Sequence, residues 1–131
     1  FKPTEQFHLY ALEWEKGEIR WYVDDVHYAT QTEQGWYSQF QTADGVWQQA
    51  KGAAPFDQSF HLLLNLAVGG HWPENVNEKG VDVEHWPRQM VVDYVRVYQC
   101  SAQTADGTGC GTKSSMAKQV SGIQPPALPT F

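Results

Sequence analysis

The sequence predicts an all-β fold, and three stretches carry that prediction. Residues 7–14 (FHLYALEW) alternate with a period of two and are rich in aromatic residues, as strands are. Residues 60–68 form a short, Leu-rich apolar run that stops at Gly69-Gly70, which favours a buried strand over a helix. Residues 90–98 are β-branched and aromatic throughout, which is also typical of a strand.

The opening third of the chain predicts a β-meander. Residues 15–17 (EKG) predict a turn after the first strand, and residues 19–23 (IRWYV) form the returning strand of a hairpin. Asp24 and Asp25 predict a second tight turn, and a third strand begins at Val26.

The remaining segments predict two long loops and a tail. Residues 30–58 are rich in Gln, Thr, Gly and Ala, and we expect a long surface connection there, followed by a second long loop over residues 71–89. Aromatic residues in the first connection either bind a ligand or pin the loop to the sheet; they are Trp36, Tyr37, Phe40 and Trp47. From residue 101 the composition changes to Ser, Thr, Gly and Pro, so we expect one domain over residues 1–100 and a linker or tail over residues 101–131.

Charge and hydropathy exclude several classes of partner. The formal net charge is −6 over 131 residues, and Lys and Arg do not cluster anywhere. Nucleic acids and anionic membranes are bound through basic patches, so neither is an expected partner. No apolar run approaches the roughly 20 residues that a membrane-spanning helix needs.

Cys100 and Cys110 are the two cysteines of the chain, and they lie in a segment rich in Gly and Thr. No histidine lies near them in the sequence, which argues against a zinc site. A small disulfide loop in an oxidising, extracellular compartment is the preferred interpretation, with two reduced thiols as the alternative.

Several of these stretches, taken in order, resemble the C-terminal half of a glycoside hydrolase family 16 domain of the bacterial laminarinase (endo-β-1,3-glucanase) type. The matching segments are residues 7–14 (FHLYALEW), 19–24 (IRWYVD), 55–70 (PFDQSFHLLLNLAVGG), 72–73 (WP) and 92–98 (VDYVRVY). The resemblance implies a concanavalin-like β-jelly-roll sandwich, present as its C-terminal half and followed by a flexible tail. It also implies a secreted bacterial protein that cleaves β-glucan with retention of configuration.

The sequence departs from that family in one respect that concerns catalysis. The family's catalytic strand, Glu-x-Asp-x-x-Glu, is absent from these 131 residues. Glu13, Glu15 and Glu18 have the same offsets, but Lys16-Gly17 predicts a turn between them. We expect these acids to be solvated, with ordinary pKa values, and therefore unsuited to acid catalysis.

Three functions therefore remain open. The chain is part of a laminarin-cleaving enzyme whose catalytic half lies upstream, a noncatalytic β-glucan-binding module, or a truncated fragment. Its expected partners are β-glucan polysaccharide and either its own missing N-terminal half or a second copy that pairs with its strand edges.

The resemblance and the local chemistry suggest substrate-binding residues. Asn65 matches the position at which relatives present an amide to the glucan, although a neighbouring loop backbone could satisfy that amide instead. Trp72 would stack on a sugar ring or anchor its loop. Trp14 is a further candidate, since alternation leaves open whether Trp14 or Glu13 faces the core. His71 either binds a sugar hydroxyl or is an exposed histidine without a role.

Asp93 is an acidic residue within the apolar run of residues 90–98. If buried, its carboxylate needs a partner or a cation. The resemblance implies that Asp93 contributes to a structural calcium site, and calcium accepts ligands of this type. A salt bridge, for example to Arg96, is the alternative. No cofactor is expected for catalysis.

Overall fold

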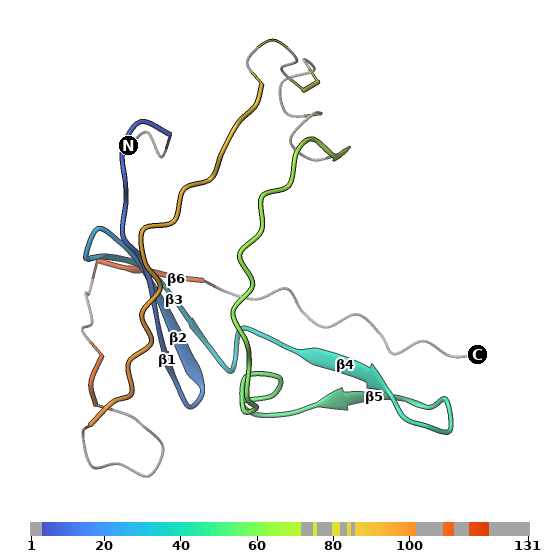
Figure 1. Cartoon of the computed structure of the whole chain (residues 1–131). Coiled ribbons are helices and arrows are strands. Elements are labelled where there is room, and N and C mark those ends of the chain that lie inside the picture. The colour runs from blue at the N-terminus through green and yellow to red at the C-terminus, as the bar shows by residue number, and fades with distance from the viewer. Residues whose placement is uncertain are drawn as a thin grey trace. The chain divides into compact units, whose positions relative to one another are not determined.

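The computed structural model describes residues 4–71, 75, 80–81, 84, 86–101, 109–111 and 116–120. The chain divides into two compact units, one made of residues 1–59 and 99–131 and the other of residues 60–98. The described residues form an essentially all-β structure, as predicted (Figure 1). No helix in the described part of the chain is long and apolar enough to cross a membrane.

The first unit contains a four-stranded sheet, sheet A, with strand order β1-β2-β3-β6. Strands β1 (Tyr10–Glu15), β2 (Glu18–Val23) and β3 (Val26–Thr32) are antiparallel and follow one another along the chain (Figure 1). The short strand β6 (Lys118–Gln119) pairs with β3 in parallel. The predicted meander is confirmed.

Two tight turns set the register of sheet A. Lys16 and Gly17 join β1 to β2, and Gly17 has a positive φ of 75°. Asp24 and Asp25 join β2 to β3 with φ values of 48° and 63°. Positive φ at both central residues defines a type I′ turn, whose twist matches that of the strands it joins.

Residues 30–58 contain a hairpin where the sequence predicted only a long connection. Strand β3 continues to Thr32, and β4 (Ser38–Gln41) then pairs antiparallel with β5 (Trp47–Ala50) as sheet B. The Asp44-Gly45 turn is closed by a backbone hydrogen bond from Thr42 N to Val46 O, 2.9 Å. An Asp-Gly pair often marks a hairpin turn, but the flanking residues are polar and rich in Gln, so the sequence did not predict strands on either side of it.

Strand β2 lies at the centre of the small core of sheet A. The buried apolar residues are Ile19 and Tyr22 on β2 and Ala29 on β3, and the buried polar residues are Arg20 and His27. The Tyr22 and His27 rings stack with their centroids 4.8 Å apart. One face of β2 therefore packs around a charged side chain rather than an apolar one.

Two segments predicted as strands are not strands in the structure. Residues 60–68 and 90–98 follow extended paths (Figure 1) but form no β-ladder with any described residue. Their apolar side chains are exposed, as at Leu63 (80%) and Val97 (81%). A strand requires a neighbouring strand to form a ladder, and neither segment forms one with the described part of the chain.

Part of the segment predicted to be a linker contacts sheet A. Gly109 N donates a hydrogen bond to Glu15 Oε1 (3.2 Å), and Val120 N donates one to Thr30 O (2.7 Å). These contacts could not be predicted from the sequence, because nearly every residue has a backbone amide that can donate a hydrogen bond.

Candidate functional site

Trp14 is a half-exposed aromatic side chain on β1. The side chains of β1 alternate, so Trp14 lies on the opposite face of sheet A from Glu13 and Glu15. Its indole Nε1 donates a hydrogen bond to Phe56 O at 2.9 Å, and the residue is 42% exposed. The hydrogen bond fixes one edge of the indole while part of its surface remains open to solvent. A fixed, partly open aromatic ring is suited to stacking on a sugar ring.

Phe56 also contacts a second tryptophan. The rings of Trp36 and Phe56 meet edge to face, with centroids 5.0 Å apart and planes at 77°. The Trp36 indole nitrogen is buried and has no hydrogen-bond partner among the described residues. Trp36 therefore packs inward and pins its loop, which was one of the two roles considered for these aromatic residues.

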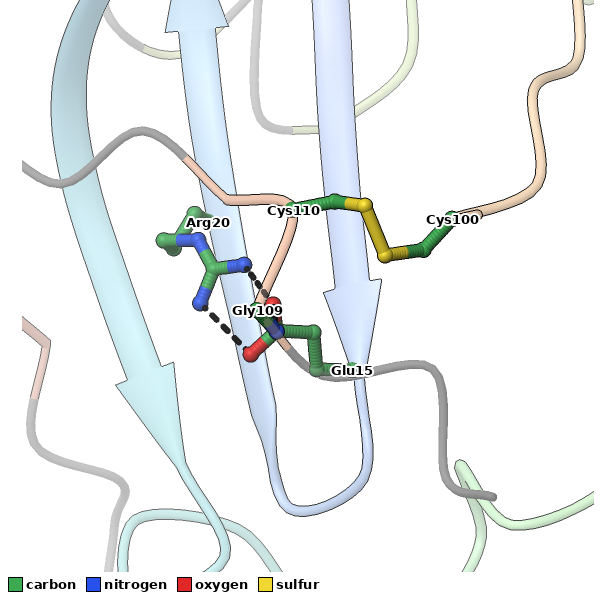
Figure 2. The surroundings of a disulfide bond; sticks show 5 residues. All are labelled: Glu15, Arg20, Cys100, Gly109 and Cys110. Carbon is green, nitrogen blue, oxygen red and sulfur yellow. Dashed lines mark hydrogen bonds and ion pairs between the residues drawn. A yellow bond between two sulfur atoms is a disulfide. The ribbon is translucent and has the colours of Figure 1, made fainter. Parts of the chain in front are cut away.

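The three glutamates with the catalytic-like offsets surround one buried guanidinium. Arg20 is 0% exposed, and its Nε lies 2.9 Å from Glu13 Oε2 and its Nη2 3.0 Å from Glu15 Oε1. Arg20 Nη1 also contacts Glu18, and the Tyr22 hydroxyl donates to Glu13. Figure 2 shows the ion pairs between Arg20 and Glu15. We call Glu13, Glu15, Glu18 and Arg20 the Arg20 cluster.

The electrostatics of the Arg20 cluster argue against acid–base catalysis by its carboxylates. Burial by itself lowers the pKa of Arg20, but the hydrogen bonds that Arg20 donates to Glu15, Glu13 and Glu18 outweigh it and raise that pKa well above its ordinary value. The oxygens of all three carboxylates are engaged by this one cation. The sequence predicted solvated acids in a turn; in the structure they are partly buried around Arg20 and keep part of their surface open to solvent.

A second polar contact holds the start of β1 to the turn after β2. His8 Nδ1 lies 2.7 Å from Asp24 Oδ2, and Leu9 N donates to Asp24 Oδ1 at 2.9 Å. These hydrogen bonds, the one from His8 first, lower the pKa of Asp24. Asp24 thus acts as a structural anchor of the hairpin.

The predicted site residues of the second unit are not drawn together by any described contact. Asn65 and His71 are both exposed, and Asn65 makes no hydrogen bond to another described residue. Trp72 lies outside the described residues. The glucan-binding roles of Asn65, His71 and Trp72 therefore stay predictions.

Asp93 is exposed in the structure. The sequence analysis expected a cation or a salt-bridge partner for Asp93 on the condition that its carboxylate is buried. Arg96 lies over the ring of Tyr94, 4.3 Å from its centroid, and no ion pair links Arg96 to Asp93 within the described residues. No group of three or more Asp, Glu, His or Cys side chains in the described part of the chain could hold a metal. Calcium takes six to eight oxygen ligands. The described residues alone therefore do not build the implied calcium site, and the role of Asp93 stays a prediction.

Sequence reasoning missed Arg20, although the signal was present. A two-residue turn at Lys16-Gly17 places Glu15 opposite Glu18 and hence Glu13 opposite Arg20, as the observed register has it. Opposite charges facing one another across an antiparallel pair attract. Applied to the sequence, that register would have placed Glu13 beside Arg20 and Trp14 on the other face.

Comparison with known protein families finds a match to the first part of the chain. Residues 1–44 match the family described as glycosyl hydrolases family 16. The predicted resemblance to glycoside hydrolase family 16 is thus confirmed.

Individual relatives agree with that family. The chain is 46% identical over 100 residues to a beta-glucanase of Rhodothermus marinus, covering 74% of this chain and 31% of that protein. It is 40% identical over 96 residues to glucan endo-1,3-beta-glucosidase A1 of Niallia circulans, covering 73% and 13%. It is 35% identical over 83 residues to a beta-1,3-glucan-binding protein of Penaeus monodon, covering 58% and 23%.

The chain thus spans less than a third of the length of each of these relatives. No solved structure matches it significantly.

Proposed function

We propose that this chain is the glucan-binding part of a secreted glycoside hydrolase that cleaves β-1,3-glucan. The catalytic carboxylates would come from outside these 131 residues and act by a retaining mechanism. Among the chain's own residues, Trp14 would stack on the polysaccharide, with Asn65, Trp72 and His71 as further contacts.

The single observation that carries this proposal is the state of the Arg20 cluster. Retaining hydrolysis needs one protonated and one ionised carboxyl group about 5–5.5 Å apart. The carboxylates with the catalytic-like offsets instead bind one buried guanidinium. These glutamates stabilise sheet A, so glucan hydrolysis requires another pair of carboxyl groups. The half-exposed Trp14, in contrast, offers an aromatic surface on which a sugar ring could stack.

The relatives support β-glucan as the ligand. The Rhodothermus marinus and Niallia circulans proteins are named for glucan hydrolysis, and the Penaeus monodon protein for β-1,3-glucan binding. The last of these favours a second candidate function, in which the chain binds β-glucan without cleaving it.

Secretion is supported by the disulfide between Cys100 and Cys110. Disulfides persist in oxidising compartments and are rare in the cytosol.

The proposal is tested with laminarin and the isolated chain. Titration calorimetry should detect binding, and Trp14→Ala should weaken it by about tenfold, or about 1.4 kcal/mol. Phe40→Ala is the matched control, because Phe40 is exposed to a similar degree (44%) but lies on sheet B. No reducing ends should be released by any of these proteins.

Two results would contradict the proposal. Hydrolysis of laminarin by the isolated chain, abolished by Glu13→Gln or Glu18→Gln, would make the Arg20 cluster catalytic. A flat titration of a folded sample would remove Trp14 as a glucan contact. Sequencing the coding DNA upstream of Phe1 then separates the two candidate functions, since an in-frame Glu-x-Asp-x-x-Glu supports the enzyme.

A further inference from the structure

The segment that covers Arg20 is tied in place by the disulfide. Cys100 and Cys110 are bonded, with their Cα atoms 5.6 Å apart, and the neighbours of Cys110 contact the Arg20 cluster (Figure 2). On one side of Cys110, Gly109 N donates to Glu15 Oε1 at 3.2 Å. On the other side, Gly111 lies directly against the guanidinium.

The approach of Gly111 to Arg20 is close enough to require glycine. A Cβ atom at Gly111 would lie 2.1 Å from Arg20 Nη2, 2.6 Å from Cζ and 2.9 Å from Nε. These three atoms all belong to the guanidinium, so Gly111 lies directly against this group. This coverage contributes to the complete burial of Arg20.

The contacts of residues 109–111 with the cluster are few. Within the described part of the chain, these contacts are one hydrogen bond from a backbone amide and one close approach by a residue without a side chain. Such contacts bury little apolar surface, so on their own they offset little of the entropy lost when a segment is held in place. The disulfide closes a loop between residues separated by 10 in the sequence, which removes much of that entropy in advance.

We propose that the Cys100–Cys110 disulfide is a redox-sensitive clamp that keeps the Arg20 guanidinium closed to water. A dithiol reductant opens it by thiol–disulfide exchange: its thiolate attacks one cysteine sulfur, and its second thiol resolves the mixed disulfide. The protein S–S bond breaks and takes up two electrons and two protons as two thiols, while the reductant becomes a disulfide.

Reducing the disulfide changes the solvent exposure of the charged groups in the Arg20 cluster. Once residues 109–111 leave, water reaches the guanidinium, and the attraction between Arg20 and its carboxylates weakens as the local dielectric rises. Arg20 lies in the middle of β2, between β1 and β3. The ion pairs at the centre of sheet A are therefore stronger in an oxidising compartment and weaker in a reducing one.

The test follows the Nε–H proton of Arg20 by NMR in the full chain. Its signal is assigned by its loss in Arg20→Lys, and its exchange with water is compared before and after addition of dithiothreitol. We expect exchange to become about tenfold faster on reduction. The double variant Cys100→Ser/Cys110→Ser should exchange at the fast rate whether or not the reductant is present.

A second variant opens the cluster while the disulfide stays intact. Gly111→Ala places a methyl group where the guanidinium lies, so it should give fast exchange in the oxidised chain. Ser101→Ala is its control, because Ser101 lies beside Cys100 on an exposed part of the same closed loop. It should keep the slow rate of the parent chain.

The proposal is overturned if Arg20 exchanges at the same rate in the oxidised chain, the reduced chain and the double variant. It is also overturned if Gly111→Ala keeps the slow rate. A third contrary result is equal loss of protection at the Thr42 amide, which bonds Val46 O in sheet B, because reduction would then unfold the unit rather than open one cluster.

Discussion

Arg20 determines what its three neighbouring glutamates can do. Each of them binds the same buried guanidinium, so their carboxylate oxygens hold Arg20 in the sheet instead of facing a substrate. Removing Arg20 would leave several partly buried carboxylates without their counter-charge, which is costly. The cluster is therefore best understood as a charged substitute for apolar packing at the centre of β2.

Asp24 gives the residue-scale prediction. Its pKa in the folded chain is lowered by His8 and by the Leu9 amide, so its stabilising contribution is present above the unfolded pKa of about 3.9. That contribution is lost as the pH falls through the lower pKa of the folded state. Asp24→Asn should therefore lower the melting temperature at pH 6, and the difference from the parent chain should shrink below about pH 4.

Circular dichroism melts across that pH range check the prediction. Asp25→Asn is the control, because Asp25 occupies the same type I′ turn, also at positive φ, but does not contact His8. Asn tolerates the left-handed conformation, so neither substitution should strain the backbone. An equal pH response in the two variants would show that the His8–Asp24 contact contributes nothing specific.

The sequence predicted the turn at Asp24-Asp25 but not the His8 contact. Two consecutive residues that tolerate positive φ between apolar strands indicate a tight turn by local chemistry alone. The partner of a side chain depends on where distant chain segments pass. The hydrogen bond from Trp14 to the Phe56 carbonyl could not be predicted for the same reason, because the two residues lie far apart in the sequence.

At the scale of elements, the hairpin of β1 and β2 depends on Gly17. Its φ of 75° is strained for a residue with a Cβ, and Gly17 O also accepts a backbone hydrogen bond from Glu33. Gly17→Ala should lower the free energy of unfolding by about 1–2 kcal/mol. Gly17→Asn should lower it less, since Asn visits this conformation more readily.

Urea titrations of the parent chain and both variants measure that order. A Cβ at Gly17 would lie 3.0 Å from Glu33 Oε2, at the end of a flexible side chain that can move aside. The expected loss is therefore one of backbone strain. Equal stability of the Ala variant and the parent chain would show that the turn changes conformation without cost.

Elements were predictable where they are paired locally. β1, β2 and β3 follow from alternation and turn chemistry because each pairs with its neighbour in the sequence. β4 and β5 were missed because their strands are short and polar. Residues 60–68 and 90–98 have the composition of strands, yet composition does not supply the neighbour that a ladder needs.

At the scale of the whole molecule, the exposed apolar segments predict self-association. Residues 60–68 and 90–98 display exposed Leu, Val and Tyr side chains and form no ladder with another described segment, which favours association with a second chain. Sedimentation velocity of the isolated chain should show association that increases with concentration. Leu63→Lys should reduce it, because Leu63 is among the most exposed of these side chains (80%).

Ala43→Lys is the control for charge, since it adds the same lysine to an exposed turn between β4 and β5. It should leave the association unchanged. A monomer at every concentration, with a cooperative melt, would show that these segments are covered within a single copy of the chain.

The parallel pairing of β6 with β3 also has a consequence for synthesis on the ribosome. Ala29 pairs with Lys118, so sheet A cannot be completed until residue 118 has emerged. Contacts this distant in sequence form slowly, because a long loop must close before they stabilise anything. The nascent chain therefore carries an open edge at β3 while the residues between β3 and β6 are being made, a period in which a chaperone would have a strand to bind.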